Sequence, residues 1–326
     1  MILKIKEKSE CIEVSITEES NVIPKKIHYC WFGHIPLPDL ALKCIASWKK
    51  YLPDYEIIEW NESNYDINVC DYVREAYKAK KWAFVSDYAR FDILYRFGGL
   101  YFDTDVELIR SIDDIVKNGS FMGCEPSYDK FAAAPGLGLA AAPGLNLYQN
   151  ILENYRIRHF IRSDGSFDQK TVVTFVTEIL VEYGFDIYDH SVQKVKDVSI
   201  YPADYFCPMD YLTGDLNITE NTRSIHHYSA TWHTGFEKIA SKITKRTSNS
   251  INVIKTFGYL ISLVFMTLDR IQKIGVKGTL KFIMRYIKTL VRNSRGGVFP
   301  NHYLSISCFT ILPYFKTVDL KGGVTA

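Results

Sequence analysis

Residues 86–108 read SDYARFDILYRFGGLYFDTDVEL, and they constrain the fold more than any other part of the chain. A run with helical character ends at Gly98 and Gly99, and an apolar strand follows at once. The strand ends in two carboxylates that are separated by one residue. A helix that is broken by glycine and followed directly by a buried strand is typical of an α/β chain.

The two carboxylates at the strand end are Asp103 and Asp105. Side chains two residues apart on an extended backbone point the same way, so we expect both to face one hard divalent cation that also binds phosphate oxygens. On spacing alone, the pair is either such a metal–diphosphate site or a solvated strand end. Asp87 and Arg90, three residues apart, share one face of the preceding helix, either as part of the same site or as a surface ion pair.

Strands and helices alternate along most of the chain. Apolar periodicity and turn residues predict strands at 23–32, 55–60, 121–126 and 138–142, extended segments at 200–202 and 223–227, and helices at 40–51, 71–81, 83–97, 147–160 and 171–183. This order predicts an α/β domain with a mostly parallel central sheet. In such sheets ligands bind beyond the carboxyl ends of the strands, where the two carboxylates lie.

Cysteine usage and the N-terminus bear on the compartment. The seven cysteines among 326 residues are scattered singly, which favours a reducing compartment over a disulfide scaffold or a zinc cluster. The N-terminal residues have no apolar stretch of the kind that a secretory signal needs, so we expect no cleaved leader.

The C-terminal part of the chain is strongly basic. Residues 238–295 contain 13 Lys or Arg and a single acidic residue, Asp269. Seven of the basic residues recur at helical spacing and form one stripe: Lys273, Lys277, Lys281, Arg285, Lys288, Arg292 and Arg295. Such a helix is typical of binding to an anionic membrane surface. The alternative is a helical bundle with a solvated basic face, and we expect no nucleic-acid partner.

Four ordered blocks carry a family resemblance. They are IPKKIHYCWFG at 23–33, WNESNYD at 60–66, WAFVSDYARFDILYRFGGLYFDTDVE at 82–107 and SIHHYSATWHTG at 224–235. Together they resemble the DXD-containing glycosyltransferases of family 32, which include bacterial capsular-polysaccharide and lipopolysaccharide sugar transferases, yeast mannosyltransferases and relatives of the clostridial glucosylating toxins. The resemblance implies a GT-A type nucleotide-sugar-binding fold and transfer with retention of anomeric configuration.

The resemblance and the charge distribution together divide the chain into four parts. They are a lead segment at 1–21, a GT-A catalytic domain at 22–237, a basic amphipathic helical membrane-association segment at 238–296 and a tail at 297–326. Residues 257–268 form an uncharged run, which is too short to span a bilayer that needs roughly 20 helical residues.

The resemblance also implies a metal site. Asp105 is the first choice for a direct ligand of Mn²⁺ or Mg²⁺, because an all-oxygen site suits these ions. Asp103 would contact the ribose or the donor sugar while supporting the metal. His226 would be the third ligand, and His227 is the alternative, because a slip of one residue on a strand exchanges its faces.

The remaining site residues are implied to bind the donor. Asp87 and Arg90 would bind sugar hydroxyls or a phosphate. Together with Asp103 and Asp105 they are the expected catalytic residues. Tyr29 and Trp31 would stack on the base, although aromatic residues at a strand end are commonly part of the core. Further donor contacts are expected from these residues: Trp60, Ser86, Gly99, Asp103, Thr231 and Trp232. Thr231 stands where family members usually have Ser.

These features predict a metal-dependent enzyme of the hexosyltransferase class. The expected donor is a UDP-sugar, with a GDP-sugar as the alternative, and the expected acceptor is a cell-envelope glycan or a lipid-linked oligosaccharide. We expect the protein in the cytoplasm, peripheral at the inner face of the cytoplasmic membrane. The alternatives are a catalytically silent membrane or assembly partner with this fold, and a phosphohydrolase of the haloacid dehalogenase kind. The phosphohydrolases have Thr or Val where this chain has Glu107.

Overall fold

The computed structural model describes residues 22–127, 130–211 and 214–229 and the single positions 243, 264, 265, 267, 268 and 276. The lead segment, almost all of the basic segment 238–296 and the whole tail lie outside the described residues. The chain divides into two compact units. The first comprises Met1–Ser166, Thr171–Pro208 and Ile218–His226, and the second comprises Phe167–Lys170, Met209–Asn217 and His227–Ala326.

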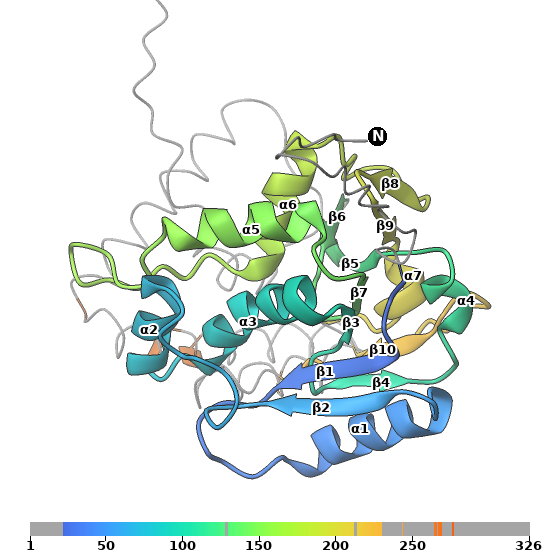
Figure 1. Ribbon diagram of the computed structural model, residues 1–326, viewed down its shortest axis with the longest axis horizontal. Coiled ribbons are helices and arrows are strands. Elements are labelled where there is room, and N and C mark those ends of the chain that lie inside the picture. The colour runs from blue at the N-terminus through green and yellow to red at the C-terminus, as the bar shows by residue number, and fades with distance from the viewer. Residues whose placement is uncertain are drawn as a thin grey trace, which may run out of the picture. The chain divides into compact units, whose positions relative to one another are not determined.

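All the helices and strands named here belong to the first unit (Figure 1). The helices are α1 (Asp39–Tyr51), α2 (Asp71–Lys78), α3 (Trp82–Phe97), α4 (Asp113–Val116), α5 (Asn146–Arg156), α6 (Val172–Glu182) and α7 (Ala203–Phe206). The strands are β1 (Lys26–Cys30), β2 (Glu56–Trp60), β3 (Gly99–Tyr101), β4 (Val106–Leu108), β5 (Phe121–Ser127), β6 (Lys130–Ala133), β7 (Leu139–Ala141), β8 (Gln193–Val195), β9 (Val198–Tyr201) and β10 (Ser224–His226). The predicted elements are therefore present, with ends that differ by a few residues.

The main sheet has the strand order β2-β1-β3-β7-β5-β9-β8, with β6 paired to β5. The pairs β1–β2, β1–β3 and β5–β9 are parallel, whereas β7 runs antiparallel to both of its neighbours. Strands β4 and β10 form a separate antiparallel pair. The expected α/β class is confirmed, and the parallel pairs lie on either side of β7, a predicted strand whose antiparallel direction the sequence pattern did not indicate.

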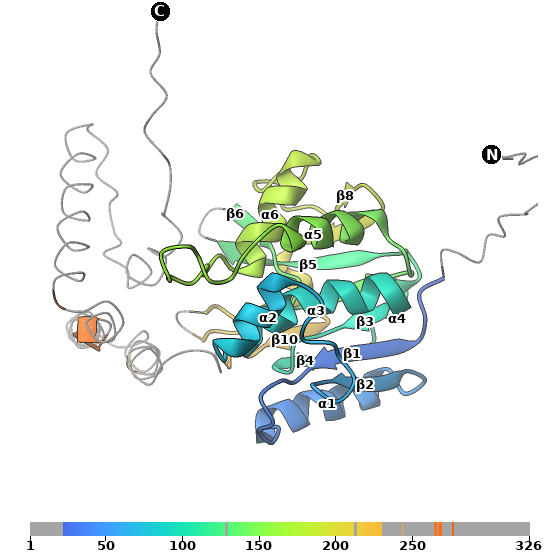
Figure 2. The ribbon, with the colours of Figure 1, turned by 60° about the vertical axis from the view of Figure 1, so that its left-hand side comes forward.

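Helices cover both faces of the main sheet. One core cluster joins α2, α3, α5 and α6 to residues such as Met122 and Cys124 of β5. On the other face Trp48 of α1 packs on Tyr29, and Phe206 of α7 stacks on Phe121. Figure 2 shows β1 lying between α3 and α1. Helix α3 is thus internal, and residues 87–94 of this helix are all buried.

Gly98 ends α3 and turns the chain into β3. Its φ is 64°, and a Cβ there would lie 2.6 Å from Cδ of Pro143 and 2.8 Å from Cδ of Pro24. The left-handed backbone and the absence of space both require glycine at this position. This turn delivers the chain from the internal helix to the strand that precedes Asp103.

A buried histidine holds the same turn. His28 of β1 is 1% exposed, and its Nδ1 accepts a hydrogen bond of 3.0 Å from the indole N–H of Trp60. The other ring nitrogen, Nε2, therefore carries the proton and donates to the carbonyl of Gly98 at 3.0 Å. Burial lowers the pKa of His28 to about 4.

We expect His28 to make the fold sensitive to acid. An unfolded histidine has a pKa of about 6.5, so below this pH the unfolded state binds a proton that the folded state excludes until about pH 4. The free energy of unfolding should fall by about 3 kcal/mol across this window through His28 alone. Urea unfolding at pH 7 and pH 4.5 should show a smaller fall for His28→Asn than for the wild type. Equal falls in both proteins would contradict this assignment.

Candidate functional site

The two carboxylates of the Asp-x-Asp sequence lie in a turn and not on a strand. The amide of Val106 donates to the carbonyl of Asp103 at 3.0 Å, and residues 104 and 105 form the turn between them. The expectation of an extended backbone through both carboxylates is therefore wrong. The chain leaves the main sheet after β3 and enters β4 of the second sheet, so each carboxylate has its own set of partners.

Asp103 is held by contacts on three sides. Its amide donates to the carbonyl of Gly136 at 2.9 Å. Its Oδ1 accepts a hydrogen bond from the hydroxyl of Tyr101 at 3.1 Å and lies 3.3 Å from Nη2 of Arg90. A Cβ on Gly136 would lie 1.9 Å from Oδ2 of Asp103, so only glycine leaves room for this carboxylate. The Asp103 side chain remains 33% exposed and thus accessible to a ligand.

Arg90 lies between two carboxylates inside the protein. It is 3% exposed, and its Nη2 is 2.9 Å from Oδ1 of Asp87. Its Nε donates to the carbonyl of Ser86 at 3.1 Å, and its guanidinium lies 5.0 Å from the centre of the Tyr101 ring. The Asp87–Arg90 pair is consequently not a surface ion pair. A buried cation that is shared by two carboxylates forms a network with a fixed geometry.

Burial and charge act against each other in this network. Burial raises the pKa of Asp87 to about 7, although the neighbouring Arg90 opposes this change. Burial would lower the pKa of Arg90, but Asp103, Tyr101 and Asp87 hold it above its ordinary value. The guanidinium therefore stays charged beneath the exposed carboxylate of Asp103.

Asp105 meets His226 at the junction of β4 and β10. Nε2 of His226 lies 3.4 Å from Oδ1 of Asp105, and both side chains are largely buried. His226 is placed there by its register opposite Val106, the residue that follows Asp105. Burial lowers the pKa of His226, but the carboxylate of Asp105 more than compensates and raises it well above its ordinary value.

The chemistry of this pair is compatible with a divalent metal. A carboxylate oxygen and an imidazole nitrogen are ligands that Mn²⁺ accepts, and phosphate oxygens and water can complete its coordination. Among the residues that the structure describes, no group of three His, Cys, Asp or Glu side chains surrounds one position. The structure brings together Asp105 and His226, whereas Asp103 is engaged with Arg90 and Tyr101.

Two further residues adjoin His226, and the sequence pattern did not indicate either. Cys207, just after α7, forms a hydrogen bond with His226. Glu125 of β5 is close enough for its charge to interact with His226, and burial raises the pKa of Glu125. Both come from distant parts of the chain with no spacing signal, so only the fold brings them to the site.

Three aromatic residues that were predicted to bind the donor each make contacts within the protein. Tyr29 is 6% exposed and donates to Glu59 at 2.7 Å, which is the core role that sequence reasoning left open. Trp60 stacks on Phe97 and donates to His28. Trp31 follows β1, is half-buried, and donates its indole N–H to the carbonyl of Ile35 at 2.6 Å.

The remaining residues that were predicted to bind the sugar donor or the metal either lie beside a backbone carbonyl or lie outside the described part of the first unit. Ser86 is half-buried and its hydroxyl donates to the carbonyl of Trp82 at 3.2 Å. Gly99 begins β3, where a Cβ would lie 2.7 Å from the carbonyl oxygen of Lys26. Thr231 and Trp232 lie outside the described residues. His227 belongs to the second unit.

Comparison with known proteins identifies the class of this region. Residues 38–122 match the family described as "Glycosyltransferase sugar-binding region containing DXD motif". Asp103 and Asp105 lie within the matched residues. The chain therefore contains a region similar to the sugar-binding region of the DXD-containing glycosyltransferases, in agreement with the resemblance that the sequence indicated.

Relatives are found among proteins from bacteria and yeast. The chain is 31% identical over 111 residues to Subversion of eukaryotic traffic protein A of Legionella pneumophila, a match that covers 26% of this chain. It is 26% identical over 227 residues, or 62% of its length, to Inositol phosphoceramide mannosyltransferase 1 of Schizosaccharomyces pombe. These matches cover 17% and 65% of the relatives' own lengths.

Solved structures with a distant likeness also include glycosyltransferases. The PaToxG glycosyltransferase is 18% identical with a TM-score of 0.37, and the match covers 50% of this chain and 70% of that one. A glycosyltransferase involved in the glycosylation of the major capsid of PBCV-1 is 11% identical with a TM-score of 0.35, over 63% and 94% of the two chains.

Proposed function

We propose that this chain is a metal-dependent, retaining glycosyltransferase that moves a hexose from a nucleotide sugar to a cell-envelope glycan. The observation that carries the proposal is the buried network of Asp87, Arg90 and Asp103 next to the Asp105–His226 pair. Each group contains one carboxylate of the DXD motif, which lies within the matched sugar-binding region. A UDP-sugar is the favoured donor, and a GDP-sugar is the alternative.

The chemistry of the transfer assigns a task to each residue. Breaking the bond between the sugar and the diphosphate builds negative charge on the leaving group while the sugar becomes oxocarbenium-like. A bound Mn²⁺ or Mg²⁺ would neutralise that charge, and Asp105 and His226 would hold it. Arg90 orients Asp103 through their ion pair, so that the carboxylate can accept hydrogen bonds from hydroxyls of the ribose or the donor sugar. Asp87 orients Arg90 from the other side.

The acceptor and the location rest on the resemblance and the basic segment. A capsular polysaccharide, exopolysaccharide or lipopolysaccharide built on a lipid carrier would be met at the inner face of the cytoplasmic membrane. Within the part of the chain that the structure describes, no helix has the length and apolar character needed to cross a bilayer. The lysine and arginine stripe that would contact the membrane lies outside the described residues.

A screen of donors tests the proposal directly. UDP- and GDP-sugars are incubated with the protein and Mn²⁺, Mg²⁺ or EDTA, and released nucleotide is measured. Metal-dependent hydrolysis of one donor supports the proposed enzyme. Absence of turnover with every donor and metal would instead favour the silent assembly partner, and release of phosphate from simple phosphate esters would favour the phosphohydrolase.

Nucleoside diphosphate should stabilise the fold only when metal is present. Binding to the folded state alone raises stability by about 2.7 kcal/mol at a ligand concentration one hundred times the dissociation constant. We therefore expect UDP or GDP to raise the melting temperature with Mn²⁺ and to have little effect in EDTA. Equal stabilisation under both conditions would point to a metal-free site.

The basic stripe should tether the protein to anionic vesicles. Each Lys or Arg near such a surface contributes about 1 kcal/mol, and salt screens this attraction. The combined change of Lys277, Lys281, Arg285 and Lys288 to Gln should release the protein from phosphatidylserine vesicles in a sedimentation assay while donor hydrolysis persists. Unchanged sedimentation at low salt would mean that the stripe is a solvated face.

A further inference from the structure

The Asp105–His226 pair joins two strands that are fixed in different ways. Strand β4, which follows Asp105, is held by α1: the indole of Trp48 donates to the carbonyl of Val106 at 2.8 Å, and the amide of Leu108 donates to the hydroxyl of Ser47 at 2.9 Å. The position of Asp105 is thus supported by α1, independently of β10.

Strand β10 lies beside the short helix α7, and the hydroxyl of Ser224 donates to the carbonyl of Phe206 at 3.2 Å. The strand contains three residues and pairs only with β4 among the described strands. An isolated two-stranded ribbon is marginally stable in water. A slip of one residue would also turn His226 to the opposite face of the strand and away from Asp105. Contacts outside the ribbon, including the one with α7, therefore help to hold its register.

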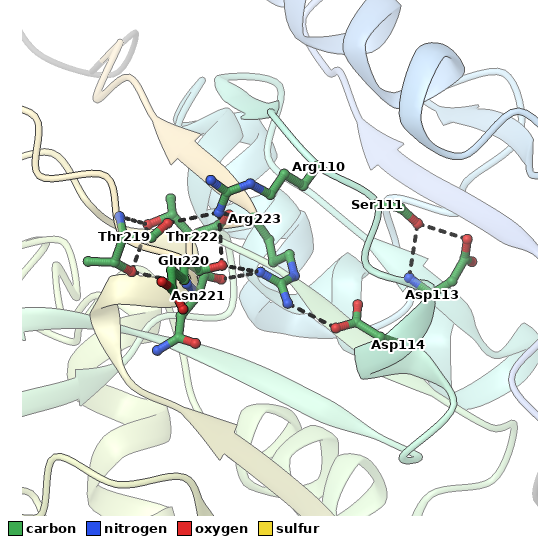
Figure 3. A network of polar contacts seen from close by, with 9 residues as sticks. All are labelled: Arg110, Ser111, Asp113, Asp114, Thr219, Glu220, Asn221, Thr222 and Arg223. Atoms are coloured by element: carbon green, nitrogen blue, oxygen red, sulfur yellow. Dashed lines mark hydrogen bonds and ion pairs between the residues drawn. The ribbon is translucent and has the colours of Figure 1, made fainter.

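Two arginines bind the loop that leads into β10 (Figure 3). Nη1 of Arg110 donates to three carbonyls, those of Thr219 at 2.8 Å, Glu220 at 2.9 Å and Thr222 at 2.9 Å. Arg223 donates to the carbonyls of Glu220 and Asn221 and pairs with Asp114 at 2.9 Å. We call Arg110, Arg223 and these carbonyls the carbonyl clamp.

The carbonyl clamp connects directly to the register of the ribbon. Arg110 lies two residues after the end of β4, and the amides of Ile109 and Arg110 both donate to the carbonyl of Arg223. Arg223 is the residue before β10. The loop is also tied to α7, since the hydroxyl of Thr222 donates to the carbonyl of Asp204 at 2.8 Å. The loop therefore has one position relative to β4 that satisfies its carbonyls.

We propose that Arg110 is a positioning residue that sets His226 opposite Asp105 before any metal binds. The inference rests on the proposed metal-dependent function. The contacts that carry it lie within the protein itself and need no bound metal. Arg110 touches neither His226 nor Asp105 among its described contacts, and it acts through the three carbonyls and the register of β10. Such supporting contacts govern metal affinity because they determine how well the ligands are preorganised.

The test measures metal affinity and backbone opening separately. Arg110→Ala should weaken Mn²⁺ binding at least tenfold in a titration followed by electron paramagnetic resonance, without any donor present. In EDTA it should also accelerate hydrogen exchange of the amides of residues 224–226. Arg110→Lys should recover much of both properties, because one ammonium nitrogen has three donors for the three carbonyls.

The control is a variant that loosens a loop elsewhere in the first unit. Glu75 accepts hydrogen bonds from His159 and from the amide of Ile161, so Glu75→Gln should weaken that loop and leave Mn²⁺ affinity unchanged. If Arg110→Ala does not fold, Thr222→Val replaces it, since it keeps the shape of the side chain and removes the bond to Asp204.

The outcomes separate this inference from the proposed function. Faster exchange at 224–226 together with weaker Mn²⁺ binding supports the positioning role. Unchanged exchange and affinity in a destabilised Arg110→Ala protein would overturn it and leave the proposed function intact. A wild-type protein that shows no Mn²⁺ binding while Arg110→Ala still accelerates exchange would contradict the metal-dependent function and with it the purpose assigned to Arg110.

Discussion

Asp105→Asn is expected to reduce donor turnover about a thousandfold at saturating Mn²⁺ while the protein still folds. The amide keeps the shape of the side chain, but it removes the charge that pairs with His226 and would bind the metal. Loss of one charged metal ligand removes several kcal/mol of stabilisation from the departing diphosphate, and about 4 kcal/mol corresponds to this factor. Steady-state hydrolysis of the donor and the melting temperature are the two measurements.

Asp54→Asn is the matched control for this variant. Asp54 is an exposed carboxylate that pairs with Lys25 at 3.3 Å, and its side chain is 76% exposed. The same change of charge there should leave turnover within twofold of the wild type. Near-normal turnover of Asp105→Asn in saturating Mn²⁺ would remove Asp105 from the metal site.

Gly136→Ala should be the second most damaging change. The added methyl group would lie 1.9 Å from Oδ2 of Asp103 and 3.3 Å from Nη1 of Arg90, so the carboxylate must move. Displacing a group by about 1 Å in a site of this kind can cost on the order of a hundredfold in rate. We expect donor turnover to fall by about this factor with little change in Mn²⁺ affinity, because Asp105 and His226 are untouched.

Gly144→Ala gives the comparison that separates crowding from backbone strain. Gly144 has a φ of 77°, and a Cβ there would meet nothing within 4 Å. This variant should lose about 1 kcal/mol of stability through strain and keep its turnover. If Gly144→Ala and Gly136→Ala lower turnover equally, the displacement of Asp103 is not the cause.

Much of the fold follows from local patterns. The apolar periodicity of residues 40–51 and 171–183 predicted α1 and α6 within a residue or two, and the glycine pair marked the end of α3. The antiparallel direction of β7 was not predictable in this way. Its three buried residues carry no sign of strand direction, which depends on how β3 and β5 approach it from distant parts of the chain.

The site was predictable to a similar degree. The helical spacing of Asp87 and Arg90 predicted their contact, and Tyr101 could have been found because it lies two residues before Asp103. The turn between Asp103 and Asp105 was missed, since an extended backbone was the simplest reading of an apolar strand end. Gly136 and Arg110 act through space on segments that are 33 and more than 100 residues away, and no local pattern indicates such contacts.

The buried ion pairs of α3 have a consequence for the evolution of this chain. Charged groups placed in a protein interior commonly contribute less to folding than apolar side chains of the same size would, whereas removal of a single partner leaves an uncompensated charge. Asp87 and Arg90 are 7% and 3% exposed, so this penalty applies to both. Coordinated replacement of both residues and Asp103 by apolar residues is thus a route to a more heat-resistant protein without sugar-binding chemistry, while each single step along that route is destabilising. Because each single replacement lowers stability, selection for stability alone does not readily remove the charged residues of α3.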